Sequence, residues 1–260
     1  QKIVEEERRN QMSGPYGTVF DQAATEVFTV HPYRRHILGH ISHLRATSVS
    51  ELRDFWNLYY APNNATLVIA GAVKHAEAQK LAKSYFEWIP RDEEPPHVTI
   101  TEPPQTSARD VTIYERLAPS PLVAMVYHTV PAGHEDIHPL ELLVNILGKG
   151  DSSRLHRQLV ADKQLATSLI VSQYQLEQGS VLFAGAMLHE VVSEIKSQIE
   201  RFHNGDISEQ ELTRARNVML KDLVVQNSRL KSKAAVLGEA VMTETDASRV
   251  NSVFRRLHAV

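Results

Sequence analysis

The amino-acid sequence predicts an α+β fold divided between two domains. Its 260 residues, of which 42% are hydrophobic and 23% charged, are enough for two cores of moderate size. Strand patterns are grouped together among patterns of packed helices, which indicates α+β rather than a doubly wound sheet. Five of the twelve prolines crowd between Pro90 and Pro104, and proline removes backbone donors and fixes φ. We therefore expect a first domain at 1–92, a proline-rich linker at 93–107 and a second domain at 108–260.

The first domain is expected to be mostly helical. The charged start, QKIVEEERRN, predicts a helix, and the capping-box residues Ser48 and Glu51 start another that ends before Pro62. The apolar run 67–70 predicts a strand covered on both faces or nearly so, and a helix follows at 75–88. Within the capped helix, apolar residues at three- to four-residue steps predict a stripe that faces a core: Val49, Leu52, Phe55, Trp56 and Tyr59.

The second domain is expected to begin with strands. Val111 and Ile113 alternate with polar neighbours, and 122–130 is an apolar strand that should lie beside them. A strand pair is expected over 167–188, with a turn at Gln178-Gly179. Ser208 and Glu211 form a second capping box. The expected helices are 139–147, 153–163, 190–204, 208–227, 229–243 and 247–258.

Composition excludes several classes of function. A net charge of -3 and a pI near 6.5 give no electrostatic reason to bind nucleic acid or an anionic membrane. The absence of cysteine excludes disulfides, thiol catalysis and thiolate metal sites. No apolar run is long enough for a membrane span in this segment.

Residues 31–73 carry a resemblance to a known family. They read HPYRRHILGHISHLRATSVSELRDFWNLYYAPNNATLVIAGAV, and HPYRR, the Thr-x-x-x-x-Leu helix start and YAPNNATLV resemble the pitrilysin/insulinase zinc metallopeptidases and their processing-peptidase relatives. The resemblance covers nearly the whole chain. It implies two LuxS-like, processing-peptidase-like α/β sandwich domains, the first incomplete at its N-terminus and the second at its C-terminus.

The resemblance gives a role to a glutamate near the start. By itself, the run of three glutamates and two arginines at 5–9 predicts a solvated helix face, with an ion pair between its two ends. Active family members hold zinc with an inverted H-x-x-E-H motif and a later glutamate on a Val-Val-x-Glu-Glu-Arg helix. Matching Ile3 and Val4 to the two valines puts Glu7 at the metal-ligand position. A carboxylate and two imidazoles leave a fourth position for a water that the metal acidifies.

The other zinc ligands are expected upstream of Gln1, because no H-x-x-E-H occurs in the sequence. The resemblance thus implies zinc in the full-length protein, while one carboxylate should hold no zinc tightly in this segment. We expect the segment alone to be inactive.

Two other histidine patterns are weaker metal candidates. His134 to His138 is literally H-E-x-x-H, the zincin signature, but Gly133 before it and Pro139 after it predict a loop leading into a helix, with His138 disfavoured in α conformation. His36, His40 and His43 have spacings that could gather them on one helix face. A solvated or packed cluster is the favoured interpretation of these three.

A glycine-rich segment after residue 147 is no phosphate loop, because it lacks the G-x-x-x-x-G-K-[ST] order. The residues alone predict a helix end at one of the glycines and a new helix start at Asp151 or Ser152. A comparable segment lines the substrate chamber in the family. The candidate chamber residues are Gly148, Gly150, Ser152, Ser153 and Arg154.

Active members also place an Arg and, seven residues later, a Tyr in the second domain, where they stabilise the developing oxyanion. The matching positions here are Val160 and Thr167, which cannot do this. The resemblance therefore points to the zinc-carrying subunit type of bacterial paired members, in which a homologous partner subunit supplies the Arg and Tyr. A homodimer is the alternative assembly.

The expected function is zinc-dependent hydrolysis of peptides inside a closed chamber, with a partner subunit supplying the Arg and Tyr. The alternative is a non-catalytic family member that acts as a chamber scaffold or holds peptide. A stand-alone zincin using His134 and His138 is a third possibility. Bacterial members of this kind are often exported, which suggests the periplasm.

Overall fold

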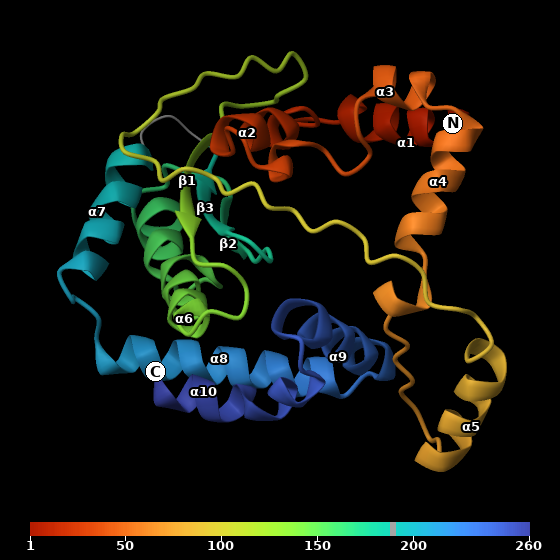
Figure 1. Ribbon diagram of the computed structural model, residues 1–260. Helices are drawn as coiled ribbons and strands as arrows, with labels where there is room; N and C mark the ends of the chain where they lie inside the picture. Colours follow the sequence, from red (N-terminus) through yellow and green to blue (C-terminus); the bar gives the residue numbers. More distant parts are fainter. Residues whose placement is uncertain (188–190) are drawn as a thin grey trace. The chain divides into compact units, whose positions relative to one another are not determined.

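The computed structural model describes residues 1–187 and 191–260. The chain forms two compact units, the first made of 1–65 and 79–119 and the second of 66–78 and 120–260. Helices make up most of the chain, and the second unit adds a three-stranded antiparallel sheet (Figure 1). The predicted α+β class is confirmed.

The three helices predicted before residue 92 form, and α2, α3 and two short 3-10 helices form in addition. Ser48 and Glu51 form the predicted capping box, in which the Glu51 carboxylate accepts the Ser48 N–H at 2.7 Å and Ser48 Oγ accepts the Glu51 N–H at 3.2 Å. The helices are α1 (Lys2–Ser13), α2 (Val19–Val27), η1 (Pro32–Arg34), α3 (Ile41–Ala46), α4 (Val49–Tyr59), η2 (Pro62–Asn64) and α5 (His75–Phe86).

The apolar stripe of α4 does not face a core, contrary to the prediction. Phe55 and Trp56 are 54% and 59% exposed, and Val49 and Leu52 more than half exposed as well. The aromatic rings instead stack on one another along the helix. The Trp56 ring lies 4.0 Å from the ring of Tyr60 at an interplanar angle of 8°, an i, i+4 contact that a single helix can make without a neighbour.

Two predicted strands do not form. Residues 67–70 and the segment around Val111 and Ile113 are both described, and both lie outside helices and strands. A strand needs a neighbour to accept and donate its backbone hydrogen bonds, and neither segment is paired in this way. Leu67 and Ile69 are accordingly 57% and 47% exposed, so these strand predictions are wrong for this chain.

The sheet of the second unit has the order β1-β3-β2, with β1 (Val123–Thr129), β2 (Leu169–Tyr174) and β3 (Ser180–Ala186). Both neighbours run antiparallel to β3, and Phe183 lies opposite Val126 on one side and Ser172 on the other. The predicted strand at 122–130 and the predicted strand pair are confirmed. The far end of that pair, at residue 188, lies outside the described residues.

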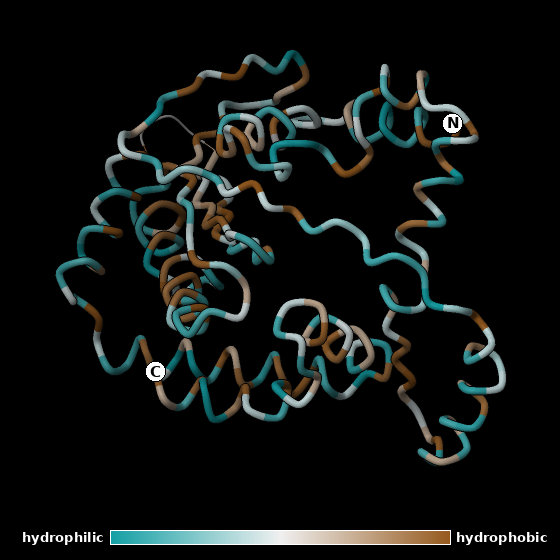
Figure 2. The backbone as a smooth tube through the Cα atoms, viewed as in Figure 1, coloured by the Kyte–Doolittle hydropathy of each residue, from teal (hydrophilic) through white to brown (hydrophobic). Residues whose placement is uncertain are grey.

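Helices cover this sheet. α6 packs against β2 and α8, and α7 against β1 (Figure 1), and hydrophobic residues concentrate along α6 and the strands (Figure 2). Leu147, Leu155, Leu159 and Ile195 are completely buried in the core. None of the helices in the described ranges is long and apolar enough to cross a membrane. The helices are α6 (Ile137–Gly148), the π-helix η3 (His156–Asp162), α7 (Val192–His203), α8 (Glu209–Asn227), α9 (Leu230–Glu244), η5 (Ala247–Ser252) and α10 (Val253–Ala259).

Gly148 is required by the close packing of α6 on β2. A Cβ atom at Gly148 would overlap Cγ2 of Val171, and a β-branched side chain has little freedom to move aside. We expect Gly148→Ala to lower the free energy of unfolding of the second unit by about 1–3 kcal/mol in urea titrations. Gly238→Ala in α9 is the control, because its nearest neighbour is Cγ2 of Val68 at 3.8 Å; it should stabilise by about 0.5–1 kcal/mol. Equal effects would contradict the packing argument.

Candidate functional site

α1 is anchored by one buried arginine. Arg8 is 8% exposed and pairs with Asp21 of α2, and the other oxygen of Asp21 lies 3.3 Å from Nε2 of His36. Nδ1 of His36 accepts the Leu38 N–H at 3.0 Å, so Nε2 carries the hydrogen that points at Asp21. This network fixes which face of α1 is buried.

Glu7 is exposed and lies about 100° around α1 from Arg8. Glu6 pairs with Arg9 at 2.5 Å and Glu5 with Arg45 at 2.8 Å, so the predicted ion pair between residues 5 and 9 does not form. Among the described residues, the Glu7 carboxylate has no hydrogen-bond or ion-pair partner. It shares a shallow hollow with Lys2, Ile3, Glu6, Asn10 and Gln11.

Glu7 fits a metal site only as a single ligand. In the part of the chain that the structure describes, no three His, Asp or Glu side chains come together as a metal site. Zinc in proteins takes three or four ligands. A zinc held by Glu7 would therefore need at least one further ligand that these residues do not bring together.

The H-E-x-x-H sequence does not form a zincin helix. His134 precedes α6, which begins at Ile137, and Nδ1 of His134 accepts the Asp136 N–H at 3.1 Å. The predicted loop and the position of Pro139 in the first helical turn are confirmed. His138 is nevertheless helical, because proline is tolerated at a helix start. Its Nδ1 lies 2.9 Å from the carboxylate of Glu141.

His36, His40 and His43 do not share a helix face, so the metal-binding arrangement that their spacing could have allowed does not form. His36 lies in a loop, and His40 caps α3 by accepting the Ser42 N–H at 3.3 Å. Only His43 lies within the helix, because α3 begins at Ile41. The rings of His40 and His43 are 5.9 Å apart.

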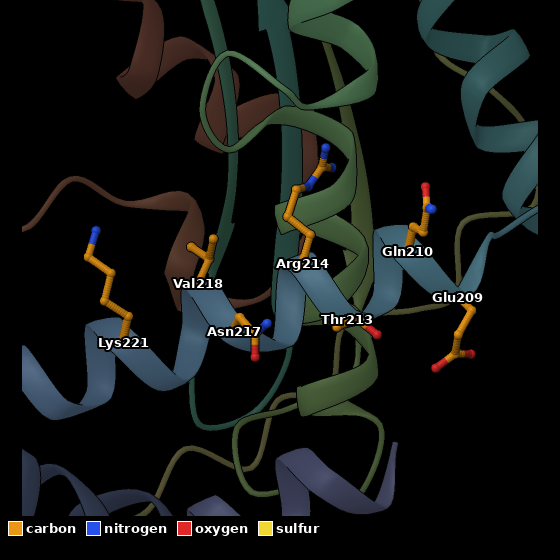
Figure 3. A pocket seen from close by; sticks show the side chains of 7 residues that line it. All are labelled: Glu209, Gln210, Thr213, Arg214, Asn217, Val218 and Lys221. Atoms are coloured by element: carbon orange, nitrogen blue, oxygen red, sulfur yellow. The ribbon is translucent and has the colours of Figure 1, made fainter.

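The glycine-rich segment connects α6 to η3. Gly148 ends α6, and Gly150 has φ +79°, a left-handed conformation that favours glycine. Gly150 and Ser152 are exposed, while Ser153 is completely buried. The Ser152 carbonyl accepts a hydrogen bond from Arg214. Arg214 is one of the α8 residues that line a shallow hollow on the surface of this helix (Figure 3). The others are Glu209, Gln210, Thr213, Asn217, Val218 and Lys221.

Arg154 is buried and ties this segment to the start of α8. Its Nε and Nη2 lie 2.5 and 2.7 Å from the two carboxylate oxygens of Glu211, and Nη2 also donates to the Asp206 carbonyl at 2.6 Å. The guanidinium lies 4.6 Å from the ring centre of Phe202. The second capping box is confirmed, since Glu211 also accepts the Ser208 N–H at 3.0 Å.

Glu211 should make stability depend on pH. The hydrogen bonds from Arg154 and Ser208 lower the pKa of Glu211 from 4.5 to about 2. Because the folded pKa lies below the unfolded one, this stabilisation is complete above pH 4.5 and is lost as the pH falls toward 2. Calorimetry at pH 6, 4 and 3 should show that the melting temperature of the second unit falls with pH, and that it falls less in Glu211→Gln. An equal fall in the variant and the unsubstituted chain would contradict this prediction.

Val160 and Thr167, which the resemblance matches to the Arg and Tyr of active members, flank the end of η3. Val160 lies within the π-helix and packs against the core, and Thr167 is exposed just before β2. The wide turn is closed by the Lys163 N–H, which donates to the Gln158 carbonyl at 3.0 Å. Neither side chain offers a charge or a phenol to an oxyanion.

The sequence and the fold are similar to those of known proteases. The chain is 27% identical over 246 residues, 92% of its length, to "Zinc protease PqqE" of Helicobacter pylori, and 23% identical over 99% of its length to "Uncharacterized zinc protease YmxG" of Bacillus subtilis. It spans 55% and 63% of the length of these two relatives.

Solved structures share the fold. A protease from Helicobacter pylori superimposes on the whole chain with a TM-score of 0.92 at 24% identity, over 65% of that protein. A peptidase M16 inactive domain from Pseudomonas fluorescens does so with a TM-score of 0.81 at 15% identity, over 62% of that protein.

A family model described as "Peptidase M16 inactive domain" matches residues 47–219, more than half of the chain. The resemblance to zinc metallopeptidases noted at residues 31–73 is thereby confirmed. The chain belongs to the peptidase M16 family, and it carries that family's inactive domain.

Proposed function

We propose that the chain is part of a zinc-dependent metalloendopeptidase and that Glu7 is its contribution to the metal site. The observation that carries this proposal is the exposed Glu7 carboxylate, which has no partner among the described residues, on a helix that buried Arg8 holds in place. Two relatives whose names describe them as zinc proteases support the proposal.

The metal, when bound, would acidify a water for attack on a peptide carbonyl. Glu7 would bind the metal, and the Arg8–Asp21 pair would keep α1 oriented so that Glu7 faces outward. Gly150 and Ser152, which are exposed, would line the path of the peptide, with Gly148 at the end of α6 beside them. Ser153 and Arg154 are buried and would support that segment from beneath.

The proposal includes a partner subunit. Val160 and Thr167 cannot stabilise an oxyanion, so a homologous chain that carries an Arg and a Tyr at these positions would supply them. The peptide is the substrate.

Reconstitution tests the proposal. The chain extended upstream through an H-x-x-E-H motif should bind zinc and hydrolyse peptides only when the homologous partner is added. The double variant Val160→Arg with Thr167→Tyr should reduce the dependence on that partner. If the assembly holds zinc and remains inactive, the proposed activity is wrong.

A second candidate is a non-catalytic member that scaffolds a chamber or holds peptide. The match to the family's inactive domain over residues 47–219 favours it. A degraded H-x-x-E-H in the full-length sequence, together with peptide binding without hydrolysis, would support this second function.

A further inference from the structure

A segment of the first unit that we call the strap, residues 102–115, is described throughout and lies outside helices and strands. It is fastened to both ends of α2 (Figure 1). Glu115 accepts a hydrogen bond at 2.5 Å from Oγ1 of Thr18, the residue that precedes α2. At the other end, Nη2 of Arg109 donates to the carbonyl of Val27, the last residue of the helix, at 3.2 Å.

Glu102 makes the densest of these attachments. One carboxylate oxygen accepts from the Thr29 N–H at 2.6 Å and the Thr29 hydroxyl at 2.5 Å. The other accepts from the Val30 N–H at 3.0 Å and the His31 N–H at 2.8 Å. Three successive backbone N–H groups therefore converge on one carboxylate, an arrangement that proteins use to bind anions.

The energetics agree with this geometry. Burial alone would raise the pKa of the Glu102 carboxyl, but the hydrogen bonds from Thr29, His31 and Val30 outweigh burial and lower the pKa to about 2. Pro103 follows Glu102 directly and restricts its backbone to extended conformations. Less conformational entropy is then lost when the side chain is seated.

A neighbouring glutamate shows that charge alone does not produce such a contact. Glu94, in the proline-rich linker, is exposed and pairs with Arg91 at 2.8 Å, three residues away. Glu102 instead reaches residues more than 70 positions earlier in the chain.

We propose that the backbone of Thr29, Val30 and His31 is an anion-binding site for carboxylates, that Glu102 is its resident occupant, and that this occupancy latches the strap over α2. A free carboxylate presents the same two oxygens. It should therefore enter the site when the Glu102 side chain is removed. All of these contacts lie within the first unit, and none of them requires the proposed peptidase activity.

Hydrogen exchange in the whole chain tests the latch. Glu102→Ala should speed the exchange of the Val30 and His31 amides roughly tenfold or more, and should make the strap more sensitive to protease. Formate added to Glu102→Ala should restore the protection of the two amides without restoring the strap. Glu94→Ala is the matched control and should change neither readout.

Unchanged protection of Val30 and His31 in Glu102→Ala would overturn the latch. Lost protection that formate at high concentration does not restore would overturn the anion site. If the alanine variant unfolds the first unit, Glu102→Gln keeps the side-chain volume and one acceptor oxygen. In Glu102→Gln, the Val30 and His31 amides should exchange faster than in the unsubstituted chain. Equal exchange rates in the two proteins would overturn the proposal.

Discussion

Replacing Arg154 with alanine is expected to lower the free energy of unfolding of the second unit by about 3–5 kcal/mol. The substitution removes a guanidinium that is 8% exposed and leaves the Glu211 carboxylate without its main partner. It also frees the Asp206 carbonyl and the face of the Phe202 ring. The loss is large because the partly buried Glu211 carboxylate keeps its desolvation cost, with only the hydrogen bonds from Ser208 left to offset it.

Urea unfolding followed by circular dichroism would measure this effect, with Arg201→Ala as the control. Arg201 pairs with Asp206 at 2.6 Å, but both side chains are about half exposed, so its loss should cost less than about 1 kcal/mol. Arg154→Lys should recover only part of the stability, because lysine lacks the planar fork that meets both oxygens of Glu211. Equal costs for the two alanine variants would contradict a structural role for Arg154.

Glu7→Gln is expected to abolish zinc-dependent hydrolysis in the chain extended upstream and combined with its partner. It should also weaken zinc binding by more than about 100-fold, since a neutral amide replaces the anionic oxygen of a three-ligand site. Calorimetric titration with zinc measures the affinity separately from activity. The melting temperature of the first unit should not change, because Glu7 is exposed and has no partner among the described residues.

Glu6→Gln is the matched control for this prediction. Glu6 shares the same hollow but is engaged by Arg9 at 2.5 Å, so its loss should leave zinc affinity nearly unchanged. Loss of zinc binding in Glu6→Gln but not in Glu7→Gln would show that Glu6, and not Glu7, is the metal ligand. Zinc bound by the unextended chain and lost with His134→Ala would instead support the zincin.

Local signals predicted much of the fold. Both capping boxes form as the sequence indicates, because Ser48 with Glu51 and Ser208 with Glu211 satisfy backbone groups within four residues. The strand pair around Gln178-Gly179 also forms, since a hairpin brings its own partner strand. In these cases the pattern and the contacts that it predicts lie in the same stretch of chain.

Features that need a distant partner were not predictable in this way. Within the described part of the chain, the run at 67–70 has the composition of a strand but no neighbour to pair with, and the stripe on α4 has no core to face. The partner of Arg154 is 57 positions away and that of Glu102 more than 70. For the candidate site, the family resemblance singled out Glu7, but nothing in the sequence indicated that Arg8 and Asp21 would hold its helix.

The exposed aromatic face of α4 carries an intrinsic fluorophore, Trp56. The chain has two tryptophans, Trp56 and Trp88, which are 59% and 74% exposed and both lie in the first unit. Tryptophan emission should therefore report on the first unit and be nearly blind to melting of the second. A segment or partner that covers α4 should shift the Trp56 emission to the blue, so docking could be followed without an added dye.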